Sequence, residues 1–373
     1  HCRYSTTGMV NRSNAQPLVI KHIKGPLALV HNGNVTNAYA LRREFEMTGA
    51  IFHGTSDTEV IAYLITQNRL ISGSIEQAVE KAMDKLRGAY SILIMSPQKL
   101  IAARDPNGFR PLCMGKTESG AIVFSSESCG LDSVGATFVR DLKPGEIVVV
   151  ENNQVRTIET HCGKKGDFCV FEFVYFARPD SVIEGASVHE ARVEAGRILA
   201  REHPVDADVV VGVPYSGLDA ALGYARESGI PYGVGFVKNN YIGRSFIQPT
   251  QGKREDAVRI KLNAVKATVA GKRVVMVDDS IVRGTTCGRI VNLLREAGAT
   301  EVHMRVSSPP FLYPCYFGTD IDSQDKLIAC RMTLPEIEQY IGVDSLGYLS
   351  VEGVRAMAKG ASCDFCVGCF TGD

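Results

Sequence analysis

The chain has 373 residues, and its 41 lysine and arginine residues balance its 41 aspartate and glutamate residues. The formal net charge is therefore zero, so no global basic field indicates nucleic acid binding. The length of 373 residues suggests two or three domains. Hydrophobic residues make up 45% of the sequence, which argues against disorder, and the apolar runs have the length of strands, so no membrane span is expected.

The ends of the sequence and its cysteines add two expectations. The first residue is His1 rather than Met, and Asp373 follows a patterned segment with no evident stop, so we expect both ends to be truncated. No signal peptide is visible. Eleven cysteines, an odd number in a long chain, favour a reducing, cytoplasmic compartment in which some thiols are metal ligands.

Residues 1–162 alternate strand-like runs with a few helices, a pattern that predicts a layered α+β domain. The segment 27–35 is predicted to be an apolar strand that ends in a sharp Asn-Gly turn at Asn32 and Gly33. That pair is the commonest β-hairpin turn, but an Asn amide beside a backbone N–H can also form an oxyanion hole. Further helices are predicted at Asp57 and over 75–86, and further strands over 88–94, over 121–125 and from 147.

The order of motifs in this region resembles the class II glutamine amidotransferase domain, an N-terminal-nucleophile fold with two sheets between helical layers. The matching segments are 3–6, 31–33, 56–58, 104–105 and 125–127. The resemblance implies that Arg3 holds the glutamine α-carboxylate and Asp57 its α-amino group, roles that suit a guanidinium and a carboxylate. It also implies that Asn32 and Gly33 stabilise the oxyanion of the amide.

The nucleophile of that family is a cysteine at the mature N-terminus, with its own α-amine as the base. It lies well before the Arg-Tyr motif. Cys2 is beside Arg3 and is not the first residue, so we interpret Cys2 as a packing residue. We therefore expect the glutaminase nucleophile to be absent from this sequence.

Residues 163–335 show the strand–loop–helix order of an α/β domain. The strand over 208–214 ends at Tyr215 and Ser216, where a helix begins, and such a junction offers an anion site. Ser216 taken alone is more typical of a helix N-cap. Other predicted elements are strand-like runs over 169–176 and 232–237 and a helix over 188–203.

A long polar and basic stretch over 238–254 follows, and it contains Lys253. It is interpreted either as a lid that closes over a polyanion and excludes water or as a solvated surface loop.

The apolar strand over 274–277 leads directly into Asp278 and Asp279. The loop behind them and the helix over 287–294 offer backbone N–H groups to an anion. Gly284 permits close backbone approach, and Thr285 and Thr286 can donate hydroxyl groups or cap the helix. Acidic oxygens suit sugar hydroxyls and hydrated Mg²⁺. The segment is therefore either a solvated turn with a capped helix or a site for a phosphorylated ribose.

The run over 274–286 closely resembles the phosphoribosyl pyrophosphate (PRPP) signature of type I phosphoribosyltransferases. The resemblance implies that the acidic pair meets the ribose hydroxyls and that the loop wraps the 5-phosphate. It places pyrophosphate on the Tyr215–Ser216 loop and Mg²⁺ near Ser216, Asp278 and Asp279. The implied PRPP-binding residues are Tyr215, Ser216, Lys253, Asp278, Asp279, Ser280, Arg283, Gly284, Thr285 and Thr286.

Cys363, Cys366 and Cys369 are spaced C-x₂-C-x₂-C. This spacing suits thiolate ligation of zinc or of an iron–sulfur cluster and does not decide between them.

The two signatures in this order, together with the segment 243–249, resemble the glutamine PRPP amidotransferase family over the whole chain. Its iron–sulfur branch implies a [4Fe–4S] cluster on Cys169, Cys315, Cys366 and Cys369. The division implied is a glutamine amidotransferase domain over 1–162, a type I phosphoribosyltransferase domain over 163–335, and a helical, cysteine-rich segment over 336–373 that packs on both.

The expected activity is the first step of purine synthesis, in which PRPP, glutamine and water give 5-phosphoribosylamine, glutamate and pyrophosphate. The resemblance further implies a homotetramer inhibited by purine nucleotides. The alternatives are an ammonia-dependent phosphoribosyltransferase, a PRPP-sensing regulatory protein without glutaminase activity, and an amidotransferase with another acceptor. A regulator of transcription predicts a basic face that is not visible, and Asp278 with Asp279 argues against another acceptor.

Overall fold

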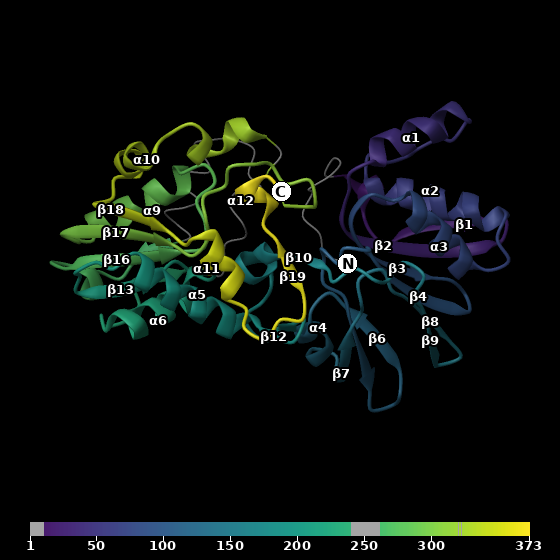
Figure 1. Ribbon diagram of the computed structural model, residues 1–373, viewed down its shortest axis with the longest axis horizontal. Coiled ribbons are helices and arrows are strands. Elements are labelled where there is room, and N and C mark those ends of the chain that lie inside the picture. The colour runs from purple at the N-terminus through teal and green to yellow at the C-terminus, as the bar shows by residue number, and fades with distance from the viewer. Residues whose placement is uncertain (1–10, 240–261, 320, 322) are drawn as a thin grey trace.

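The computed structural model describes residues 11–239, 262–319, 321 and 323–373. It contains two lobes that lie side by side (Figure 1). The first lobe is built on antiparallel sheets and the second on a parallel sheet.

The main sheet of the first lobe is six-stranded and antiparallel, and helices cover one of its faces (Figure 1). The core between the sheet and the helices is formed by buried aliphatic side chains such as Ile61, Leu64 and Ile92. The strands, in spatial order, are β1 (Leu18–His22), β2 (Gly25–Val35), β3 (Gly88–Met95), β4 (Lys99–Arg104), β8 (Ile147–Glu151) and β9 (Gln154–Ile158). The helices are α1 (Ala38–Met47), α2 (Asp57–Leu70) and α3 (Ile75–Lys85).

A smaller three-stranded sheet packs against the other face of the main sheet. Ala102 and Val148 of the main sheet share a buried cluster with Met114 of the small one. The small sheet contains β6 (Ile122–Ser125), β5 (Cys113–Thr117) and β7 (Ala136–Asp141), with the short helix α4 (Ser128–Asp132) against it. Helices, sheet and sheet therefore form layers, as the alternating pattern predicts.

The second lobe has a four-stranded parallel sheet with helices on both faces (Figure 1). Val275 and Val277 point to one side, and Val274 and Met276 to the other. Burial on both faces explains why this strand is apolar without alternation. The strands are β13 (Val209–Gly212), β16 (Arg273–Asp278), β17 (Glu301–Val306) and β18 (Ser345–Tyr348); the helices are α5 (Val188–Glu202), α6 (Gly217–Ser228), α9 (Thr285–Glu296) and α10 (Leu334–Ile341).

Other short elements complete the second lobe. They are the π-helix η2 (Glu172–Phe176), β11 (Val182–Ile183), β12 (Ala186–Ser187), β14 (Phe236–Lys238), β15 (Leu262–Ala264), α8 (Lys266–Val269) and α11 (Val351–Ala356).

The two lobes are joined by a parallel strand pair and by two buried ion pairs. Strand β10 (Asp167–Cys169) pairs with β19 (Asp364–Cys366), which precedes the helix α12 (Gly368–Thr371), and these elements lie between the lobes in Figure 1. Arg104 contacts Glu184 at 2.6 Å, and Arg110 contacts Glu172 at 2.6 Å. Breaking one partner of such a pair leaves a buried charge uncompensated, which is strongly destabilising.

Three expectations for local structure need correction. The Asn-Gly pair makes no hairpin turn, because β2 continues to Val35 in full register with β3. The apolar run over 169–176 is a strand only to Cys169 and then turns into the π-helix, which brings Glu172 to Arg110. The expected strand over 232–237 is reduced to a single bridge at Tyr232 and the short β14.

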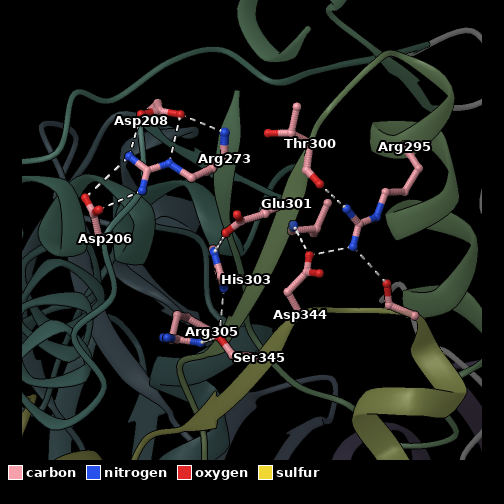
Figure 2. A network of polar contacts seen from close by, with 12 residues as sticks. Asp206, Asp208, Arg273, Arg295, Thr300, Glu301, His303, Arg305, Asp344 and Ser345 are labelled. Atoms are coloured by element: carbon pink, nitrogen blue, oxygen red, sulfur yellow. Dashed lines mark hydrogen bonds and ion pairs between the residues drawn. The ribbon is translucent and has the colours of Figure 1, made fainter. Parts of the chain in front are cut away.

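Ion pairs stabilise the parallel sheet at the amino ends of its strands (Figure 2). Arg273, which begins β16, contacts Asp206 at 2.6 Å and Asp208 at 2.8 Å. Arg295 donates to the Thr300 carbonyl at 2.8 Å and contacts Asp344 at 2.5 Å. This edge of the sheet is opposite the edge where Asp278 and Asp279 lie, so it stabilises the sheet without occupying the carboxyl ends of the strands.

Among the residues that the structure describes, no helix is both long enough and apolar enough to cross a bilayer.

The Arg273 contacts predict an acid-dependent stability difference. Hydrogen bonds from Arg273 lower the pKa of Asp208 to about 2. The pKa of an aspartate in an unfolded chain is about 3.9. The stabilisation is therefore present above about pH 4 and is lost as the pH falls toward 2. Arg273→Gln should lower Tm at pH 7 by about 1–3 °C, and the gap to the unsubstituted protein should close in acid. Arg331→Gln, on an exposed turn, is the control, and a gap that persists at low pH would contradict the assignment.

Candidate active sites

The acidic pair lies where β16 ends, at the carboxyl edge of the parallel sheet. Asp278 is the last residue of the strand, and the backbone N–H of Asp279 donates to its Oδ1 at 2.9 Å. Asp279 is buried, and its carboxylate accepts hydrogen bonds from the Ser280 hydroxyl at 2.5 Å and from the Ser216 hydroxyl. Ligands in open α/β sheets bind at this edge.

Ser216 belongs to the neighbouring strand–loop–helix unit, between β13 and α6. It occupies the position before the helix, but its side chain makes no capping bond and donates to Asp279 instead. The alternative interpretation of Ser216 as an ordinary N-cap is therefore not supported. The loop can lie this close because Gly217 has no Cβ, which would be 2.4 Å from the Val277 carbonyl oxygen. Tyr215 is exposed, with the Lys238 amino group 4.0 Å from its ring centroid.

The loop behind the acidic pair ends at the start of α9. Gly284 takes the N-cap position with φ +79°, and a Cβ there would be 2.6 Å from Ile328. Of the two roles considered for Thr285 and Thr286, capping is not observed, because both are among the first residues of the helix. Their side chains and that of Arg283 are exposed, so they remain available to an anion at the helix N-terminus.

Burial and mutual repulsion disfavour two negative charges at this edge. The pKa of Asp278 is raised well above its ordinary value by burial and then by the neighbouring Asp279. Burial also raises the pKa of Asp279, against the opposing effects of Ser216, Ser280 and Arg192. A pair of this kind favours a ligand that supplies positive charge or hydroxyl donors.

Arg192 is a residue that no pattern in the sequence singles out. It is buried on α5 and donates to the carbonyl oxygens of Phe173 at 2.7 Å and Ala177 at 2.7 Å. Its charge acts on Asp279. Its position among helix residues carries no motif, so only the tertiary structure identifies it.

The residues expected to bind an amide substrate gather around the end of β2. Asp57 is buried at the start of α2, and its Oδ2 accepts from the Val35 N–H at 3.0 Å, two residues beyond Gly33. His31 Nδ1 lies 3.7 Å from the same oxygen. The side-chain oxygen Oε1 of Gln16 accepts a hydrogen bond from the His31 N–H at 2.7 Å, so Gln16 orients this strand.

Gly33 has φ +139°, and a Cβ there would be 2.1 Å from the Ala89 carbonyl oxygen. Only glycine fits this position, whose backbone is held in an uncommon conformation.

Arg3, Lys253 and most of the expected lid, over 240–254, lie outside the described residues, as does Cys2. Their expected roles remain predictions.

The four cysteines expected to form one ligand set lie together between the lobes. Cys169 ends β10 in register with Cys366 of β19, and Cys369 lies on α12. Burial raises the pKa of Cys169 to about 12, with contributions from the Cys315 and Cys366 thiols. Burial and the other three thiols also raise the pKa of Cys369.

Cys363 lies apart from this set, near Glu184 and Arg104. Within the described residues, no three or more His, Cys, Asp or Glu side chains lie close enough together to hold a metal ion. The thiols are therefore neighbours that affect one another but do not form a closed coordination site.

Comparisons with known proteins agree with both lobes. Residues 1–133 match the family model of a glutamine amidotransferase domain, and residues 189–308 match that of a phosphoribosyl transferase domain. The amidophosphoribosyltransferase of Archaeoglobus fulgidus is 47% identical over 373 residues, which cover 100% of this chain and 81% of the relative. That of Methanocaldococcus jannaschii is 49% identical over 388 residues, with coverages of 100% and 82%.

A solved structure of similar extent is the glutamine PRPP amidotransferase from B. subtilis, complexed with ADP and GMP. It is 47% identical, with a TM-score of 0.90, and the match covers 100% of this chain and 82% of that one. The predicted fold class, an α+β glutaminase domain followed by an α/β phosphoribosyltransferase domain, is confirmed.

The raised pKa of Asp278 predicts that this carboxylate destabilises the ligand-free protein. Ionised Asp278 is costly at pH 7, because its folded pKa lies above the unfolded value; below about pH 4 the group is protonated in both states and the cost disappears. Asp278→Asn should therefore raise Tm at pH 7 by a few degrees, the scale that about 1 kcal/mol gives in a domain of this size.

The gain from Asp278→Asn should vanish near pH 4. Asp132→Asn, at an exposed position of α4, is the matched control and should leave Tm unchanged. A lower Tm for Asp278→Asn at pH 7 would show that the carboxylate has a stabilising partner.

Proposed function

The chain belongs to the amidophosphoribosyltransferase family, and from that premise we propose how its own residues carry out the reaction. The enzyme converts PRPP, glutamine and water into 5-phosphoribosylamine, glutamate and pyrophosphate, which begins purine synthesis. The observation that carries our assignment of the transfer site is the contact of Ser216 with Asp279, which joins two loops at the carboxyl ends of adjacent strands.

In this proposal the acidic pair binds the two ribose hydroxyls of PRPP. Loop 280–286 and the start of α9 hold the 5-phosphate, and the Tyr215–Ser216 loop holds the pyrophosphate. Raised pKa values at Asp278 and Asp279 suit partners that donate hydrogen bonds or bring positive charge. Lys253, outside the described residues, is assigned to the polyanion.

Phosphoribosyltransferases generally use Mg²⁺, and here Ser216, Asp278 and Asp279 would hold it. The set of two carboxylates and one hydroxyl fits a hydrated Mg²⁺, which takes few protein oxygens. The bound ion supplies charge neutralisation for the leaving pyrophosphate.

The transfer step exchanges one bond for another at C1 of the ribose. The C1–O bond to pyrophosphate breaks with its electron pair on pyrophosphate, and the lone pair of ammonia forms the C1–N bond. The ammonium so formed then loses a proton. The protein contributes position and charge stabilisation, and no covalent enzyme intermediate is needed.

We propose that ammonia comes from the first lobe, where water hydrolyses the side-chain amide of glutamine through the cysteine nucleophile of the family, which we expect to be absent from this sequence. We assign the oxyanion to the Asn32 amide and the Gly33 N–H, the substrate ammonium to Asp57 and its carboxylate to Arg3. The lobes are fastened by the buried pairs Arg104–Glu184 and Arg110–Glu172. We propose that ammonia passes along this interface to the second lobe without entering bulk water.

We further propose a [4Fe–4S] cluster on Cys169, Cys315, Cys366 and Cys369. The donor chemistry fits, because Cys169, Cys315 and Cys369 pack against one apolar cluster and Cys366 is the strand partner of Cys169, although the four thiols are not closed around one point. Each ligand must lose its proton on binding. The cluster would supply a cross-link between β10, the loop at Cys315 and α12.

The remaining partners are extended from the relatives. The B. subtilis structure contains ADP and GMP, and we propose purine nucleotides as inhibitors of this protein and a homotetramer as its assembly. We also propose a reducing, cytoplasmic location, because an odd number of cysteines in a long chain is typical of that compartment.

The transfer-site proposal predicts that the acidic pair is needed with either nitrogen donor. Asp279→Asn should lower kcat/KM for PRPP about 100-fold, with glutamine and with ammonium alike, because the loss is in the second lobe. Initial rates of the full-length enzyme with PRPP and Mg²⁺ measure this. Asp219→Asn, on α6 near the same loop, is the matched acidic control. Unchanged PRPP kinetics in Asp279→Asn would remove the pair from the site.

The cluster proposal predicts visible charge-transfer absorbance and about four iron and four sulfide per chain in protein purified without oxygen. Cys366→Ser should abolish both, because one ligand is lost. Cys363→Ser should retain both, because Cys363 lies near Glu184 and Arg104 rather than in the set. Stoichiometric zinc without visible absorbance would contradict the assignment.

A further inference from the structure

A loop of the second lobe reaches across to the first lobe and lies against the end of β2. This bridging loop, residues 315–318, begins at Cys315 and ends at Gly318. The Asn34 side-chain amide donates to the Tyr316 carbonyl oxygen at 2.7 Å. The ring of Phe317 stacks on that of Phe109, with centroids 4.2 Å apart and planes inclined at 15°. The loop is therefore held by both polar and aromatic contacts.

Arg110 is the buried centre of this contact. Its Nε and Nη2 both donate to the Phe317 carbonyl oxygen, at 3.2 Å and 3.1 Å, while its Nη1 donates to Glu172 at 2.6 Å. Glu172 neutralises the buried charge of Arg110, and the Nε and Nη2 donors hold the bridging loop. Charge-assisted bonds in a buried setting are among the stronger ones.

Gly318 shows how closely the two backbones approach. It has φ +110°, and a Cβ there would be 2.6 Å from Arg110 Nη2 and 3.4 Å from the carbonyl carbon of Gly33. The bridging loop thus packs directly on Gly33, whose own backbone has the uncommon φ of +139°. A strained backbone persists when its surroundings hold it there.

We propose that the bridging loop positions the Asn32–Gly33 segment, with Asn34, Arg110 and Gly318 as its positioning residues. The inference rests on the proposed oxyanion role of Asn32 and Gly33. Donors stabilise an oxyanion only when they are fixed before the charge develops. Amide hydrolysis in the first lobe therefore depends on a loop of the second lobe that contains none of the residues assigned to glutamine or PRPP.

Gly318→Ala tests this dependence in the full-length enzyme. The added methyl group must displace Arg110 or the loop, so kcat with glutamine should fall about 10-fold, because small misplacements of reacting groups are costly. The glutamine KM should stay within about twofold, since ground-state binding is untouched. The ammonium-driven rate should not change. Gly25→Ala is the matched control: its φ of +113° is equally unfavourable, but nothing lies within 4 Å of its Cβ.

Asn34→Ala keeps the test open if Gly318→Ala does not fold. It removes the hydrogen bond to the Tyr316 carbonyl oxygen, and we expect kcat with glutamine to fall about 3-fold. The double variant should lose less than the product of the two single effects, because both act through one contact.

Asn32→Ala separates the two hypotheses. If it leaves glutamine turnover intact, the oxyanion assignment is wrong, and the bridging-loop inference is wrong with it. If Asn32→Ala abolishes turnover while Gly318→Ala and Asn34→Ala behave like Gly25→Ala, only the bridging-loop inference is overturned. Equal losses with glutamine and ammonium in Gly318→Ala would also overturn it.

Discussion

The burial of two adjacent carboxylates, Asp278 and Asp279, at the carboxyl edge of the parallel sheet is the physical constraint on which the transfer site of the second lobe depends. A strand buried on both faces delivers them to the carboxyl edge of the sheet, and Ser216 from the adjacent unit fixes one of them. Burial raises the pKa values of both carboxyl groups, so their ionised forms are unfavourable in the ligand-free protein. Function-related strain of this kind is stored where a ligand releases it.

The stabilising charges of the same sheet lie at its other end. Arg273 and Arg295 pair with acidic residues at the amino ends of the strands (Figure 2), and these groups are partly exposed. Stability and ligand binding therefore depend on different residues at opposite ends of the sheet. A substitution at one end is expected to have little effect at the other, because the two sets of residues have no contacts in common.

The interface between the lobes does more than hold them together. Arg110 pairs with Glu172, anchors the loop behind Cys315, and borders Gly33 through Gly318. The thiols, the amide site and the junction of the lobes therefore share one neighbourhood. A structural change in one of these three regions is expected to displace residues of the other two, because the closely packed backbones have little room to move.

The sequence alone predicted both domains, their order and the acidic pair at a strand end, because apolar strands, small-residue loops and helix starts are local patterns. It also predicted that Asn32 and Gly33 form one unit, but not that they lie within a continuous strand. Arg192, Gln16 and the bridging loop carry no local pattern. Their roles arise from contacts between residues far apart in the chain, as between Asn34 and Tyr316, and only the tertiary structure decides which distant groups meet.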